Sequence, residues 1–169
     1  MRKILLICTM AILVFACKSG STAPTTPEPV SNAPATKLDK TSQVGIKGDW
    51  QVVSVSYPGS EYIKVNSFNI ADSKCFVGST WHFISNNNKG NVTLNSPNCT
   101  AFTSAITWYI NKEGQFVLKI LDEGLKSKKV KTGFVLAVRN QSETSFELVD
   151  KISVGNNPTD VVYHFQKVN

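Results

Sequence analysis

Residues 46–169 are predicted to form an all-β domain, an eight-stranded antiparallel up-and-down barrel with a long first loop. Apolar and polar residues alternate in short runs, which is the period of a strand with one buried face. Residues rich in Asn and Gly separate the runs. No stretch of a dozen residues in this region shows the helical period. Strands joined in this way close most economically into a barrel, because closure removes both sheet edges.

The predicted strands are runs of five or more residues in which every second residue is apolar. They span residues 49–57, 79–85, 90–95, 104–110, 115–121, 129–139, 145–151 and 160–168. Most connections are short and contain Asn or Gly, which accept the positive φ of tight hairpins. These connections are 86–90, 112–114, 140–144 and 155–159. A single helical turn is expected within 66–77.

The apolar face of these strands must point into the barrel, and it is rich in large aromatic side chains. The inward-facing aromatic residues are Trp50, Trp81, Phe83, Trp108, Phe116, Phe134, Phe146, Tyr163 and Phe165. The opposite face is polar. An eight-stranded barrel is just wide enough for its own side chains to fill. These aromatic residues therefore leave little space inside.

Composition excludes several classes of protein. Of the 169 residues, 41% are hydrophobic and 18% are charged, which is typical of a globular chain. The net charge of +6 is too small to indicate a nucleic-acid binder, so no nucleic acid is expected as a partner. Four cysteines are too few for a disulfide scaffold. We expect a monomer.

The first 16 residues resemble a bacterial lipoprotein signal peptide. Arg2 and Lys3 precede an uncharged apolar run that ends at Ala16, too short to span a bilayer. Leu13–Val14–Phe15–Ala16–Cys17 resembles the lipobox. That resemblance implies cleavage before Cys17 and acylation of its thiol, giving a stable membrane anchor. The alternative is an ordinary signal peptide followed by a chance cysteine.

Residues 17–45 are predicted to be a lipidated cysteine followed by a disordered tether. Residues 18–44 contain four of the seven prolines, many Ser and Thr, and no aromatic residue. Such a segment buries too little apolar surface to offset the entropy of ordering. As a flexible coil it would span roughly 30 Å.

A family resemblance rests on an ordered set of motifs that spans about residues 46–168. Gly48–Asp49–Trp50 resembles the lipocalin signature at the first strand. The wider pattern is similar to small lipocalin-like lipoproteins of Bacteroidetes. Its segments are Ile70–Cys75, Ser79–Asn88, Cys99, Ile106–Trp108 and Tyr163–Phe165. The resemblance implies that Trp50 plugs the closed end of the barrel.

The resemblance also implies function and place. It implies a small apolar ligand in the barrel or at its mouth, with ligand contacts from Phe68, Trp81, Phe83, Trp108, Phe116, Phe134 and Tyr163. The alternative is a filled barrel without a ligand, acting as a structural or interaction lipoprotein of the cell envelope. The outer membrane is the expected location. No acidic cluster follows Cys17, which favours the periplasmic side.

One departure from the lipocalin pattern concerns a basic residue. Lipocalins place such a residue late in the barrel, where it covers the tryptophan. The only arginine of this domain, Arg139, lies on the sixth predicted strand, and we assign it no such role.

Cys75 and Cys99 are the two cysteines of the domain. An even pair in an oxidising compartment favours a disulfide, and two buried free thiols are the alternative. No Cys-x-x-Cys or nearby histidine indicates a metal site, so no metal is expected.

Neither catalysis nor a cofactor is indicated by the motifs. His82 and His164 fall on the polar face and are interpreted as surface histidines, and no nucleophile or phosphate-binding signature accompanies them. The basic run 126–131 has two interpretations: a solvated hairpin tip, or a contact with anionic lipid headgroups.

The first connection, 58–78, is the longest of the domain and is unusually apolar. Tyr62, Ile63, Val65, Phe68 and Ile70 lie within it. Because an exposed apolar loop must cover something, we expect a lid over the open rim, pinned at Cys75 if the disulfide forms.

Overall fold

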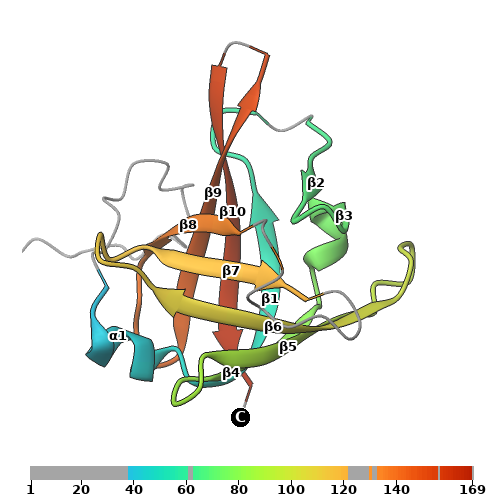
Figure 1. Cartoon of the computed structure of the whole chain (residues 1–169). Helices are drawn as coiled ribbons and strands as arrows, with labels where there is room; N and C mark the ends of the chain where they lie inside the picture. The colour runs from blue at the N-terminus through green and yellow to red at the C-terminus, as the bar shows by residue number, and fades with distance from the viewer. Residues whose placement is uncertain (1–37, 61–62, 122–129, 131–132, 156, 169) are drawn as a thin grey trace, which may run out of the picture.

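The computed structural model describes residues 38–60, 63–121, 130, 133–155 and 157–168. Its strands form a closed antiparallel barrel in the order β1-β10-β9-β8-β7-β6-β5-β4 (Figure 1). Each barrel strand pairs with the next barrel strand along the chain, and the pairing of β1 with β10 closes the barrel. The predicted eight-stranded up-and-down barrel is therefore confirmed.

The strands of the barrel agree closely with the predicted runs. They are β1 (Gly48–Ser56), β4 (Thr80–Ile84), β5 (Lys89–Leu94), β6 (Phe102–Ile110), β7 (Phe116–Ile120), β8 (Phe134–Arg139), β9 (Ser145–Val154) and β10 (Asn157–Lys167). The predicted connection 155–159 is too long, because Pro158 and Thr159 already pair with Ser153 and Ile152 of β9. The predicted strand 129–139 is present as β8 from Phe134 to Arg139, and its residues 129, 131 and 132 lie outside the described residues.

Within the described residues, four further elements lie outside the barrel ladder. The long connection between β1 and β4 contains a two-stranded sheet of β2 (Asn66–Ser67) and β3 (Ala71–Asp72), followed by the 3₁₀ helix η1 (Ser73–Phe76). The helical turn expected within 66–77 is thus present. A six-residue helix, α1 (Lys40–Gly45), precedes β1. Figure 1 shows α1 near one end of the barrel and β2–β3 towards the other.

Residues 38–45 were predicted to be part of the disordered tether, but in the structure they pack against the barrel. The Asp39 side chain caps α1 by accepting from the Ser42 backbone N–H at 2.8 Å. Helix α1 is joined to two hairpin turns, through Gln43 to Asn88 and through Gln141 to the Ser42 carbonyl. Leu38 is buried. The composition argument failed here because one buried leucine and a capped turn suffice to dock a short polar segment.

The interior of the barrel is filled by aromatic side chains. Phe146 stacks on Phe165 with ring centroids 4.6 Å apart, and Trp108 stacks on Phe116 at 5.5 Å. Phe83 contacts Trp108 at 5.2 Å and lies near the centre of this cluster. Burial of such rings dominates core energetics, and their stacked and edge-on pairs add specificity.

A pocket at the barrel mouth

A pocket of about 360 Å³ opens between the long loop and three barrel strands. Phe68, Asn69 and Ile70 form its loop side. Phe102 from the start of β6, Ile120 from the end of β7 and Phe134 from the start of β8 form the strand side, together with Val130. Since these strand ends meet at one rim, the pocket lies at the mouth. All of the lining side chains except that of Asn69 are apolar, while polar and apolar atoms expose similar areas to the pocket.

Phe68 separates the pocket from the barrel interior. Its buried ring lies 5.2 Å from the rings of Phe76, Phe134 and Tyr163, measured between centroids. The loop turns inward here because Phe68 and Asn69, between β2 and β3, have positive φ values of 54° and 57°. A bulky residue rarely adopts this conformation. The four aromatic contacts around Phe68, which include Trp81, therefore hold a strained turn in place.

Hydroxyl groups tie the loop to the barrel wall. The Tyr163 hydroxyl donates to Ser67 Oγ, and Tyr57 Oη lies 2.6 Å from Ser73 Oγ. Both serines are buried, so these bonds satisfy groups that would otherwise be costly to bury. Burial raises the pKa of Tyr163 well above its usual value. Tyr163 therefore stays a hydrogen-bond donor at physiological pH.

The predicted Cys75–Cys99 disulfide is confirmed. It joins η1 to the segment before β6, with Cα atoms 5.8 Å apart. The long loop is thus attached covalently at its C-terminal end and by Phe68 and Ser67 nearer its middle. This arrangement fits the predicted lid, whose expected member Tyr62 lies outside the described residues.

Loss of this disulfide is expected to lower the free energy of unfolding by about 3 kcal/mol, because the bridge closes a loop of 24 residues in the unfolded chain. The measurement is urea titration of the Cys75→Ser/Cys99→Ser variant against the parent. Reductant should destabilise the parent and leave the double variant unchanged. A loss below about 1 kcal/mol would mean that the bridge adds little beyond the packing of Phe68 and Phe76.

The seven predicted ligand-contacting residues divide into two groups. Phe68 and Phe134 line the mouth pocket. The other five fill the interior, where each is fully or almost fully buried: Trp81, Phe83, Trp108, Phe116 and Tyr163. They contact one another and the remaining core aromatics, so they form the floor under the mouth and do not line this pocket. The pocket residues Phe102 and Ile120 were not predicted as ligand contacts, and Ile70 was predicted only as part of the lid.

Trp50 lies buried at the opposite end of the barrel, close to α1. Its indole N–H donates to the Ile46 carbonyl at 2.7 Å, and its ring meets that of Phe146 edge-on at 4.7 Å. Lys167 Nζ lies 5.6 Å from the ring centroid. Lys167 is therefore the late basic residue over the tryptophan. Lys167 was not predicted for this position, because Arg139 was the only basic residue weighed for it.

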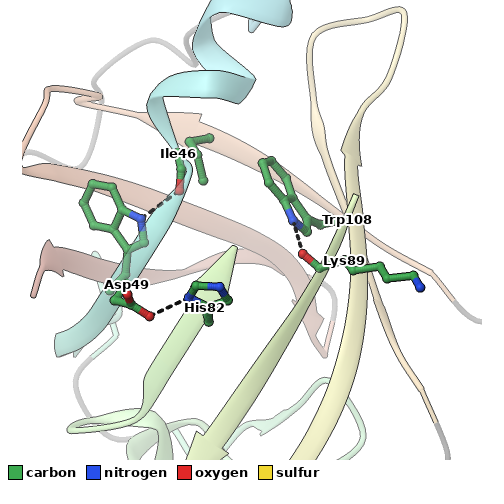
Figure 2. A network of polar contacts seen from close by, with 6 residues as sticks. Ile46, Asp49, His82, Lys89 and Trp108 are labelled. Atoms are coloured by element: carbon green, nitrogen blue, oxygen red, sulfur yellow. Dashed lines mark hydrogen bonds and ion pairs between the residues drawn. The ribbon is translucent and has the colours of Figure 1, made fainter. Parts of the chain in front are cut away.

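Two other polar contacts at this end join neighbouring strands. Figure 2 shows Asp49 Oδ1 directed at His82 Nδ1, 2.6 Å away, and the Trp108 indole donating to the Lys89 carbonyl at 3.0 Å. His82 and Asp49 are both exposed, so this pair adds little to stability. His82 is thus a surface histidine paired with a carboxylate.

A carboxyl group inside the barrel wall was also missed. Asp150 lies on the same inward face of β9 as Leu148 and Ile152, and it pairs in register with Val161. Burial raises the pKa of Asp150. Strand alternation alone could have identified this residue, because an acidic side chain occupies an inward position.

Several expectations concern residues outside the described ranges. Cys17, the signal peptide and tether residues 17–37 are among them, as are the lysines of the basic run 126–131. In the described part of the chain, no helix has the length and apolar character needed to cross a membrane. The same residues contain no group of three or more His, Cys, Asp or Glu side chains placed to hold a metal ion.

Comparison with known proteins identifies a family. A family model described as a lipocalin-like domain matches residues 46–135, slightly more than half of the 169-residue chain. The match includes β1 through β7, both disulfide cysteines and the residues of the mouth pocket. No curated protein matches the chain, and neither does any solved structure. Together with the closed eight-stranded barrel, the match shows that the chain belongs to the lipocalin-like domain family.

Proposed function

We propose that this domain binds a small apolar molecule at the mouth of its barrel. The pocket beside Phe68 carries the proposal, because its volume of about 360 Å³ lies within the range of small-molecule sites. Its walls come from a loop and from strand ends on a rigid barrel. An apolar ligand that binds there would displace water from a preformed surface.

Shape and packing favour the mouth over the deep interior as the binding place. Ligand entry below Phe68 would require several aromatic contacts to separate, including those with Phe76 and Tyr163. By contrast, Ile70, Phe102, Ile120 and Phe134 are only partly buried, so a ligand would remove their exposed apolar surface from water. A ligand is therefore proposed to rest on the lid and the rim, above the aromatic floor.

A charge placed in the pocket should abolish binding. We expect Ile70→Asp to weaken binding of a fluorescent fatty acid at least tenfold, about 1.4 kcal/mol, since an unpaired carboxylate is costly in an apolar site. Fluorescence titration measures the effect. Val135→Asp is the matched control, because Val135 is exposed on the outward face of β8. Equal weakening by both variants would place the site elsewhere.

The filled interior supports a second candidate, a structural or interaction protein without a ligand. Stacked pairs such as Phe146–Phe165 and Trp108–Phe116 occupy the space that a deep ligand would need. Native mass spectrometry of the purified protein separates the two. A retained lipid-sized mass supports ligand binding, whereas a bare chain together with no binding across a lipid panel supports the second candidate.

We also propose that Cys17 anchors the protein to the outer membrane, with the folded domain on the periplasmic side. The support is the lipobox-like Leu13–Cys17 sequence after an apolar run, together with the Cys75–Cys99 disulfide, which is typical of an oxidising compartment. Twenty residues, 18–37, separate Cys17 from Leu38, a length that would hold an anchored domain clear of the headgroups.

Metabolic labelling tests the anchor. Cys17→Ser should lose labelling by a fatty-acid probe, because the acylated thiol is removed. Cys8→Ser is the matched control, since Cys8 would leave with the signal peptide, and it should label like the parent. Equal labelling of Cys17→Ser and the parent would refute the anchor.

A further inference from the structure

Three chemically reactive side chains meet on the outward face of the barrel, away from the mouth pocket. Ser56 lies at the end of β1, His164 on β10 and Glu147 on β9. Ser56 Oγ is 3.0 Å from His164 Nε2, and His164 Nδ1 is 3.3 Å from Glu147 Oε1. A hydroxyl, an imidazole and a carboxylate thus stand in a line across three neighbouring strands.

The register of the sheet fixes this line. His164 pairs with Glu147 across β10 and β9, and with Ser54 across β10 and β1. Ser56 lies two residues further along β1 on the same face, so its hydroxyl reaches the far ring nitrogen. The Asn140 side-chain amide donates to Glu147 Oε1 at 2.9 Å and orients that carboxylate. Each group is therefore held by a strand position and not by a loop.

The hydrogen-bonding chemistry gives each group a direction. An ionised carboxylate only accepts, so Glu147 favours the tautomer with the proton on His164 Nδ1. Nε2 then carries a lone pair and accepts from the Ser56 hydroxyl. A nucleophile bonded to a base that a third group orients is the arrangement that activates serine.

The three side chains are partly shielded and still reachable. The side chains of His164 and Glu147 are 33% and 18% exposed, and Ser56 is half-buried. Val162, directly opposite Ser56 across the ladder, is buried. Solutes can therefore reach the hydroxyl, while the apolar neighbour limits the water around it.

We propose that Ser56 is a nucleophile that accepts an acyl group from a carboxylic ester, with His164 as its base and Glu147 as a positioning residue. A bond forms between Ser56 Oγ and the carbonyl carbon, and the bond from that carbon to the leaving oxygen breaks. The hydroxyl proton passes to His164 Nε2 and then to the leaving alkoxide or phenolate. The products are an acyl-serine ester and an alcohol.

Acetylation by p-nitrophenyl acetate tests this proposal on the full chain. One acetyl group is expected on the peptide that contains Ser56, detected by peptide mass mapping. Ser56→Ala and His164→Gln should each slow this acetylation at least tenfold. Ser54→Ala is the matched control, because Ser54 is an exposed serine on the same face of β1, and it should react like the parent.

The positioning role of Glu147 requires a measurement that distinguishes it from a general loss of structure. Glu147→Gln should slow acetylation, and Glu147→Asp, which keeps the charge, should retain more of the rate than Glu147→Gln. Near-UV circular dichroism checks that all variants keep the parent fold. Acetylation that is absent from Ser56 in the parent, or equal in the parent and His164→Gln, would overturn the proposal. Failure here leaves the mouth pocket unaffected, because the two sites share no residue.

Discussion

Replacement of Trp50 by alanine is expected to lower the free energy of unfolding by about 3–5 kcal/mol, the range for a large aromatic side chain removed from a core. Trp50 is fully buried, and its contacts join three parts of the closed end. The indole N–H bonds the Ile46 carbonyl, the ring packs on Phe146, and Lys167 lies over it. Its loss would leave a cavity and an unsatisfied buried carbonyl.

Two further variants divide this effect between its contacts. Trp50→Phe keeps a ring but loses the bond to Ile46, with an expected cost of about 1–3 kcal/mol. Lys167→Met keeps the aliphatic stem and removes only the charge above the ring, with an expected cost of about 0.5–1 kcal/mol. Urea titration measures all three. A loss under about 1 kcal/mol for Trp50→Ala would show that Trp50 is not the plug of the barrel.

The barrel was predictable because its signal is local and repeated. Alternation of apolar and polar residues identifies each strand, and Asn or Gly at positive φ ends many of them, as Asn88, Gly114 and Asn140 do. Strand ends were less predictable. Pro158 and Thr159 resemble turn residues, yet they continue the β9–β10 ladder, because cross-strand pairing outweighed local propensity.

The ordered segment at 38–45 was not predictable from composition. Its residues are mostly polar, and Leu38 and Ile46 become core residues only because the barrel end offers them a surface. This stabilisation comes from tertiary contacts, which the Pro, Ser and Thr content of the segment does not reveal.

The mouth was predicted in outline and missed in detail. The apolar character of 58–78 predicted a lid, and Phe68, one of the residues of that connection, lines the pocket. The sequence pattern could not predict how deeply Phe68 inserts into the barrel. That depth follows from two left-handed residues and two hydroxyl bonds, to Ser67 and Ser73, which are properties of the folded loop.

Phe68→Ala is expected to be the second variant of large effect, lowering the free energy of unfolding by about 3–5 kcal/mol. Phe68 contributes to four aromatic pairs, and it is the ring that closes the barrel interior from the mouth pocket. Its removal should join the pocket to the space that the ring vacates. We therefore expect the variant to bind larger apolar ligands than the parent, even though it is less stable.

The backbone at Phe68 provides a control for this prediction. Alanine keeps a Cβ at a φ of 54°, whereas glycine adopts that conformation without strain. Phe68→Gly should therefore be as stable as Phe68→Ala or up to about 1 kcal/mol more stable, although glycine is usually the more destabilising substitution. Urea titration gives the stability order, and fluorescent fatty acids of increasing chain length give the depth of the pocket. If both variants unfold like the parent, Phe68 does not hold the lid. If both are destabilised but accept only the ligands of the parent, the aromatic floor closes over the vacated space, and binding stays confined to the rim.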